Sequence, residues 1–156
     1  MKQGVLCREF RHTLICTDVY LALHLLTGPA VELEPVNATM SSTAISTYGA
    51  LEPGHCIDGN TVPVATLPHG GICSTTNQDA TPWIAIDYDT RVIVERVEIF
   101  NRVDCCGDRT QNVDVRISDE LPTSGSQMFS GGTLLGHFAG PATDGQHIIV
   151  SGQKLL

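Results

Sequence analysis

The sequence has few positive charges, no long apolar run and no sustained helical repeat. Its 156 residues carry 9 Lys and Arg against 17 Asp and Glu, which gives a formal charge of −8. This balance argues against nucleic acid or an anionic membrane as a partner, because both need clustered Lys and Arg. No uninterrupted apolar segment reaches the roughly 18 residues that a membrane-spanning helix requires. No long helical pattern follows residue 30, which disfavours a helical bundle.

The sequence also lacks an arrangement suited to catalysis. An enzyme would need a paired acid and base or an activated nucleophile, and the chain shows neither. His69 has no His or Glu three or four positions away, so metal-ligand spacing is absent and we interpret it as a loop histidine. We therefore expect a binding protein and not an enzyme.

The residues that are abundant indicate β-structure. Gly, Pro, Ser and Thr alternate with short β-branched runs, as in an all-β sandwich with one core. Apolar residues at every second position predict strands within 82–88, 91–100, 112–117, 133–138 and 147–150. The only tryptophan, Trp83, begins the first of these and is expected in the core.

The chemically densest stretch lies between two predicted strands and reads Arg102-Val103-Asp104-Cys105-Cys106-Gly107-Asp108-Arg109. Its position predicts the tip of a β-hairpin. Arg102 and Arg109 offer planar arrays of donors and no acceptors, which suits a ligand rich in oxygen atoms. Asp104 can hold one or both guanidinium groups in place. A sugar has oxygens on its edges and C–H groups on a face, so this combination suits a sugar.

This stretch resembles the signature of the F-type lectins, or fucolectins, in which adjacent cysteines are framed by Arg-x-Asp and a second Arg. Other landmarks of the family follow in its order, at 41–43, 57–60, 69–73 and 82–87, so the resemblance covers roughly residues 32 to 152. It implies a discoidin-like β-sandwich jelly roll that binds fucosylated glycans with calcium. It also implies that the protein is secreted and acts in innate immunity.

The resemblance further implies a role for each residue of the motif. Arg102 and Arg109 would donate hydrogen bonds to the sugar, Asp104 would orient them, and Cys105 and Cys106 would be bonded to each other and pack against a carbon face of the sugar. Thr75 occupies the position, separated from Arg102 by 26 intervening residues, where the family has a histidine. The alternative is therefore an adhesion or protein-interaction module of the same fold that has lost sugar binding.

A calcium site is expected in the loop around Asp58-Gly59-Asn60. Asp58 and Asn60 offer hard oxygen ligands across a glycine, although the same triplet is equally suited to a plain turn. The resemblance favours calcium at this loop, and His55 is a third candidate in the set.

The domain is expected to span residues 31–156, without the last strand that the family adds. Residues 1–30 have basic residues before the apolar run 19–26, which predicts either a secretory signal peptide or an extension outside the domain. Six cysteines and the glycosylation triplet Asn37-Ala38-Thr39 favour secretion.

Cys73 lacks its family partner, so it pairs with Cys56, stays free or pairs beyond this sequence. The oligomeric state stays open, a homo-oligomer included.

Overall fold

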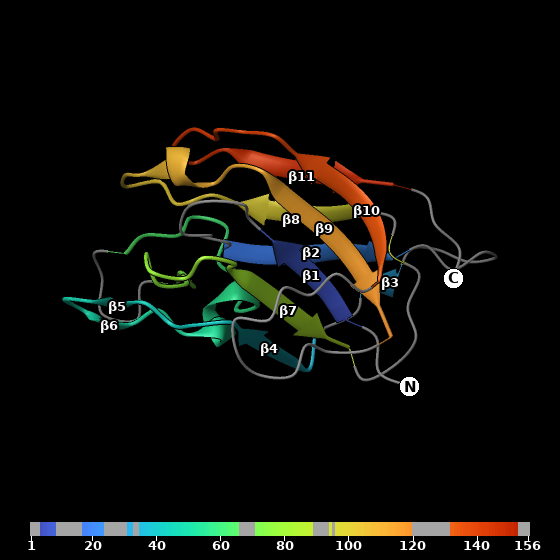
Figure 1. Cartoon of the computed structure of the whole chain (residues 1–156), viewed down its shortest axis with the longest axis horizontal. Coiled ribbons are helices and arrows are strands. Elements are labelled where there is room, and N and C mark those ends of the chain that lie inside the picture. The colour runs from blue at the N-terminus through green and yellow to red at the C-terminus, as the bar shows by residue number, and fades with distance from the viewer. Residues whose placement is uncertain are drawn as a thin grey trace.

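Two antiparallel sheets form the fold (Figure 1). The computed structural model describes residues 4–8, 17–23, 31–32, 35–65, 71–88, 94, 96–119 and 132–152, the first three segments as backbone only. The five-stranded sheet has the order β10 (Thr133–Phe138), β9 (Val113–Ser118), β1 (Gly4–Arg8), β7 (Trp83–Asp87) and β4 (Asn37–Met40). The four-stranded sheet has the order β11 (His147–Ser151), β8 (Arg96–Phe100), β2 (Thr17–Leu23) and β3 (Val31–Glu32).

Three smaller elements lie between these strands. They are the hairpin of β5 (Ile45–Ser46) and β6 (Gly49–Ala50) and the 3₁₀ helices η1 (Pro53–Cys56) and η2 (Gly107–Arg109). Within the described residues no helix is long and apolar enough to cross a membrane.

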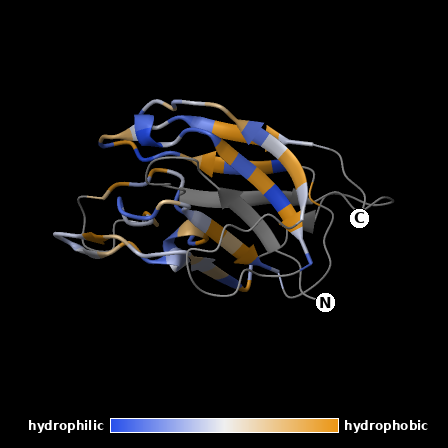
Figure 2. Cartoon of the chain, viewed as in Figure 1, coloured by the Kyte–Doolittle hydropathy of each residue, from blue (hydrophilic) through white to orange (hydrophobic). Residues whose placement is uncertain are grey.

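The core lies between the two sheets, where β8 and β11 bury alternate residues and β7 buries all five of its residues. β9 buries Val113, Val115 and Ile117, and β8 of the other sheet buries Val97 and Ile99 in the same cluster. The alternation is visible as successive hydrophobic and hydrophilic bands along β9 (Figure 2). Each such side chain contributes roughly 1.5–3 kcal/mol when it is fully buried. The prediction of a β-sandwich is confirmed at this level.

The predicted strand positions are confirmed closely in the second half of the chain. β7, β9, β10 and β11 fall at the expected residues, and β8 occupies the last part of the expected 91–100. Residues 91–93 and 95 lie outside the described residues. Trp83 is buried, as expected.

The predicted β-hairpin around residues 102–109 is wrong. β8 belongs to the four-stranded sheet and β9 to the five-stranded sheet, so the segment between them crosses from one sheet to the other. Alternation shows that a strand buries one face, but it does not identify the neighbour to which that strand bonds. The dense stretch is therefore a crossover loop at one end of the sandwich.

The first 30 residues contribute strands to both sheets. β1 lies between β7 and β9, and β2 pairs with β8 and β3. The expectation of a secretory leader or an extension at residues 1–30 stays a prediction.

Candidate functional site

The crossover loop is held in shape by Asn101, at the end of β8. Its side-chain amide donates to the carbonyl oxygens of Gly107 (3.0 Å) and Thr143 (2.9 Å), and its Oδ1 accepts from the Thr110 hydroxyl (3.0 Å). Its backbone N–H donates to the Gln146 carbonyl at 3.0 Å. Asn101 is buried, so these bonds are protected from water. One side chain thus joins both ends of the loop to the neighbouring segment 143–146.

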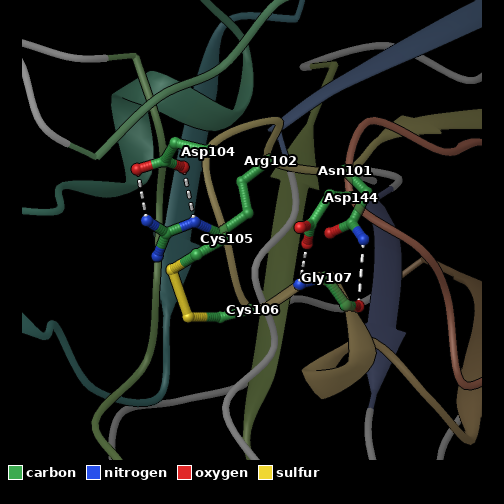
Figure 3. Close-up of a disulfide and its surroundings, with 7 residues drawn as sticks. All are labelled: Asn101, Arg102, Asp104, Cys105, Cys106, Gly107 and Asp144. Atoms are coloured by element: carbon green, nitrogen blue, oxygen red, sulfur yellow. Dashed lines mark hydrogen bonds and ion pairs between the residues drawn. A yellow bond between two sulfur atoms is a disulfide. The ribbon is translucent and has the colours of Figure 1, made fainter.

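Gly107 allows the loop to approach that segment closely. Its N–H donates to Asp144 Oδ1 at 2.7 Å, opposite the bond that its carbonyl accepts from Asn101. A Cβ at this position would lie 2.6 Å from backbone atoms of Thr143 and Asp144, so no other residue fits without a shift. Figure 3 shows Asn101, Gly107 and Asp144 together beside the disulfide.

Arg102 and Asp104 form a bidentate ion pair. Arg102 Nε donates to Asp104 Oδ1 at 2.8 Å and Nη2 donates to Oδ2 at 2.6 Å. The Arg102 side chain is only 9% exposed, and the Asp104 side chain 17%. The hydrogen bonds and charge of Arg102 hold the pKa of Asp104 below its ordinary value, against desolvation, which acts to raise it. The remaining N–H groups of the guanidinium are fixed in direction and available to a ligand.

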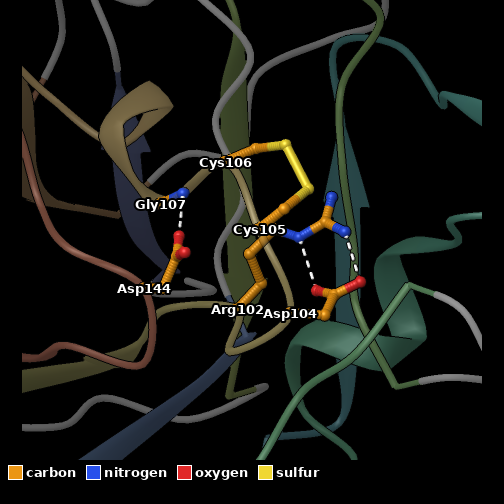
Figure 4. A network of polar contacts seen from close by, with 6 residues as sticks. All are labelled: Arg102, Asp104, Cys105, Cys106, Gly107 and Asp144. Atoms are coloured by element: carbon orange, nitrogen blue, oxygen red, sulfur yellow. Dashed lines mark hydrogen bonds and ion pairs between the residues drawn. A yellow bond between two sulfur atoms is a disulfide. The ribbon is translucent and has the colours of Figure 1, made fainter.

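Cys105 and Cys106 are bonded to each other, which confirms that prediction. The Arg102 guanidinium lies between the Asp104 carboxylate and this disulfide in both close-up views (Figures 3 and 4). Cys106 adopts the left-handed conformation, φ 64°, which is uncommon for a residue with a Cβ. The Cys105–Cys106 disulfide therefore places an apolar sulfur surface next to the charged Arg102 guanidinium.

Arg102 and Arg109 line an open pocket of about 520 Å³. The other walls come from segments that are distant in sequence, and they are mostly hydroxyl or amide side chains or small apolar ones: Thr43, Ala44, Ile45, Ser46, Leu51, Ala65, Ser74, Thr76, Asn77 and Gln78. The β5–β6 hairpin and the crossover loop extend from the same end of the sandwich (Figure 1). The pocket thus combines cationic donors, neutral polar groups and apolar surface.

Asp79 fastens two of these walls to each other. Its Oδ2 accepts from the hydroxyls of Ser41 (2.5 Å) and Ser42 (2.7 Å), and its Oδ1 accepts from the Thr81 N–H (3.1 Å). Ser42 in turn accepts from the Thr76 N–H at 3.1 Å. The segment before the β5–β6 hairpin is thereby fixed against the segment that carries Thr76.

The structure does not place Thr75 in the pocket. Its side chain is completely buried, and its Oγ1 has no hydrogen-bond partner among the described residues. Ser74 and Thr76, one residue to either side, line the pocket instead. The expected sugar contact from Thr75 is corrected on this ground.

The predicted calcium loop brings Asp58 and Asn60 together. Asp58 Oδ1 accepts from the Asn60 N–H, and Asn60 Oδ1 accepts from the Val62 N–H, each at 3.0 Å. Both side chains converge on Gly71, where an added Cβ would overlap the Asn60 amide and lie 3.2 Å from Asp58 Oδ2. The polar atoms nearest that added Cβ are the Asn60 amide nitrogen and one Asp58 carboxylate oxygen, so a calcium ion held by Asp58 and Asn60 stays a prediction.

His55 does not belong to that donor set through its ring. Its Nδ1 lies 3.0 Å from the Ile72 carbonyl oxygen, a contact in which the ring nitrogen is the donor. Calcium binds oxygen ligands, and an imidazole nitrogen is not one. Among the described residues no cluster of three or more His, Cys, Asp or Glu is placed to hold a metal ion.

The structure identifies the disulfide partner of Cys73. Cys73 is bonded to Cys56, at the end of η1, and both residues are fully buried. This was one of the three predicted alternatives. His69 lies outside the described residues.

Several residues that shape the site were not predicted from the sequence. Asn101 and Asp144 brace the crossover loop, Asp79 joins two walls, and Asn77 and Gln78 line the pocket. They are single polar residues in loops, and their sequence spacing does not reveal that they meet. Among the family landmarks in the sequence, only the one at residues 41–43 lies near one of these pocket walls.

The fold and the match to a family model define the class of the protein. The model of the NedA-like, galactose-binding domain matches residues 55–134, just over half of the chain, and the chain belongs to this family. The match includes the calcium-loop candidates, the crossover loop and strands β7 to β9.

Individual relatives are lectins from eels. The chain is 35% identical to fucolectin-5 of Anguilla japonica over 89 residues, 56% of this chain and 46% of the relative. It is 36% identical to fucolectin-1 of the same species over 73 residues, 47% of this chain and 39% of the relative. It is 32% identical to a fucolectin of Anguilla anguilla over 74 residues, 47% and 45% of the two chains.

The chain thus spans about half the length of the curated relatives that it matches. Lectins bind without catalysing a reaction, which agrees with the expectation that this chain is not an enzyme. No solved structure matches the chain significantly.

Proposed function

We propose that this chain is a secreted, calcium-associated lectin domain on a discoidin-like jelly roll, and that it binds L-fucose-type glycans. The observation that carries the proposal is Arg102, which lines the pocket, is held by two hydrogen bonds to Asp104 and lies beside the Cys105–Cys106 disulfide. The likeness to eel fucolectins supports the choice of sugar.

The proposed binding mode follows from the chemistry of these groups. Arg102 and Arg109 donate to the ring oxygen and hydroxyls of the sugar, and Asp104 keeps the Arg102 fork oriented by accepting two of its hydrogen bonds. The disulfide packs against the C–H face, where sulfur makes favourable dispersion contacts. No bond is formed or broken in the ligand.

Calcium has a supporting role in this proposal. Asp58 and Asn60 would hold the ion, and it would fix the loop that precedes the segment 61–65, whose residues Pro63 and Ala65 contact the crossover loop. We expect calcium to raise the melting temperature and to strengthen sugar binding indirectly, since neither candidate ligand lines the pocket.

Titration calorimetry tests the proposal with L-fucose and, as a comparison sugar, D-glucose, in calcium and after chelation. Fucose should bind, and Arg102→Ala or Arg109→Ala should weaken it by roughly tenfold or more, because a hydrogen bond from a charged group contributes about 1.5–3 kcal/mol. Arg96→Ala on β8, which does not line the pocket, is the matched control and should bind normally.

The alternative of a module without sugar binding makes the opposite prediction. A folded protein that binds no saccharide on a glycan array, with or without calcium, would overturn the lectin assignment. Fucose binding that is unchanged in both arginine variants would place the sugar elsewhere on the molecule.

A further inference from the structure

The triplet Asn37-Ala38-Thr39 forms the first three of the four residues of β4, an outer strand of the five-stranded sheet. Asn37 is exposed and Thr39 partly exposed, while Ala38 between them is buried in the core. Side chains alternate along a strand, so the Asn and Thr of the triplet point away from the core together. The chain has no second Asn-x-Ser/Thr triplet.

We infer that Asn37 is a glycosylation site that carries an N-linked oligosaccharide. Transfer occurs on the unfolded chain. The Asn37 Nδ2 forms a bond to C1 of the first sugar of a lipid-diphosphate-linked oligosaccharide, the C1–O bond to the diphosphate breaks, and Nδ2 loses one proton. The lipid diphosphate leaves, and no oxidant or reductant is needed. The folded structure must then accept a large hydrophilic substituent, and an outward side chain on an outer strand does so.

The rest of the structure agrees with the compartment that this reaction requires. Both disulfides of the described residues, Cys56–Cys73 and Cys105–Cys106, form in an oxidising environment such as the secretory pathway. The position also protects the fold. β4 has one strand neighbour, β7, among the described residues, and a sugar chain next to the other edge hinders pairing with another molecule.

The attachment point lies outside the lining of the proposed sugar pocket. β4 runs from Asn37 toward the end of the sandwich that carries the β5–β6 hairpin, and the pocket begins only at Thr43 (Figure 1). The four residues of β4 alone extend about 10 Å at the usual rise of a strand. An oligosaccharide at Asn37 therefore leaves the pocket open.

The test is secretion of the full chain from animal cells behind an added leader, followed by peptide mass mapping. Treatment with an N-glycosidase in heavy-oxygen water should convert Asn37 to a labelled aspartate. Thr39→Ala should abolish the glycan, and Thr39→Ser, which keeps a hydroxyl, should retain it. Secreted wild-type protein with an unmodified Asn37 would overturn the inference.

A second measurement compares sugar affinity before and after enzymatic removal of the glycan. The affinities should agree within about twofold, and a larger change would contradict the placement of the glycan away from the pocket. If no sugar binds at all, the lectin proposal fails, but the mass of the Asn37 peptide still decides the modification.

Discussion

At the scale of single residues, burial decides how much an ion pair contributes. Arg102–Asp104 and Arg96–Glu98 have the same spacing and similar N···O distances of 2.6 Å, but the arginine side chains are 9% and 49% exposed. Arg102→Met should leave Asp104 without its cation and lower stability by roughly 3 kcal/mol, the low end for a broken buried pair, because Asp104 keeps some contact with water.

Arg96→Met is the control and should cost less than about 1 kcal/mol, since exposed pairs contribute little. Denaturant unfolding of both variants measures the difference. Equal losses of stability would show that the Arg102 pair is solvated like a surface pair.

The lowered pKa of Asp104 predicts how binding depends on pH. Because the folded-state pKa lies below the ordinary value of 3.8, the stabilisation is complete above that value and is lost as pH falls through the lowered pKa. Fucose affinity should therefore not change through protonation of Asp104 between about pH 7 and pH 5. Calorimetry across this range, with Asp104→Asn as the control that cannot ionise, measures it. A loss of affinity centred above about pH 5 in the wild type alone would contradict the prediction.

Thr75 gives a residue-scale prediction opposite to the one that the sequence suggested. A histidine at this fully buried position would overfill the core and lower stability by about 1–3 kcal/mol, without reaching the sugar. Thr75→Val removes a buried hydroxyl that has no described partner and should raise the melting temperature. Thr76→Val, at the half-buried neighbour in the pocket wall, should not. Tighter fucose binding by Thr75→His would show that the side chain does face the pocket.

At the scale of elements, the pocket depends on connections between loops. Asp79→Ala removes the acceptor for Ser41, Ser42 and the Thr81 N–H, so the link between the wall that carries Thr76 and the wall that carries Thr43 is weakened. The bonds that remain run from the Thr76 N–H to Ser42 and from the Ala44 N–H to the Ser74 carbonyl. Each hydrogen bond contributes roughly 0.5–1.5 kcal/mol, so we expect a loss of about 2 kcal/mol or more and weaker fucose binding.

Glu52→Ala is the matched control for Asp79→Ala. Glu52 is exposed at the start of η1 and makes no side-chain capping bond there, so the same loss of one carboxylate should leave stability and binding unchanged. Thermal unfolding and calorimetry on both variants decide the point. Normal fucose affinity in Asp79→Ala would show that the walls hold their positions without this link.

The elements also show what the sequence can predict. The positions of β7, β9, β10 and β11 follow from an alternation that depends only on which face of a strand is buried. The partner of each strand does not follow from it, which is why the segment after Phe100 was predicted as a hairpin tip and proved to be a crossover between sheets. Within the site, the motif at Arg102 to Arg109 marks one wall. Asp79, Asn77 and Asp144 reach the site only through tertiary contacts, which no local pattern encodes.

At the scale of the whole molecule, the two disulfides have different effects because they close loops of different length. Cys56 and Cys73 are separated by 17 positions and are both buried in the core, whereas Cys105 and Cys106 are adjacent. A cross-link lowers the entropy of the unfolded chain more when its loop is longer, and a loop of this size corresponds to about 3 kcal/mol. The adjacent pair restricts almost nothing beyond its own peptide bond.

Replacing both members of each pair by Ala should therefore separate stability from binding. Cys56→Ala with Cys73→Ala should lower the free energy of unfolding by about 3 kcal/mol or more, because the loss of buried sulfur adds to the lost cross-link. Cys105→Ala with Cys106→Ala should unfold nearly as the wild type does, but should bind fucose more weakly, because the sulfur surface beside Arg102 is gone. Denaturant unfolding and calorimetry on both double variants give the two readouts. If the Cys105/Cys106 variant loses stability as severely as the Cys56/Cys73 variant and binds normally, the adjacent disulfide supports the fold and not the ligand.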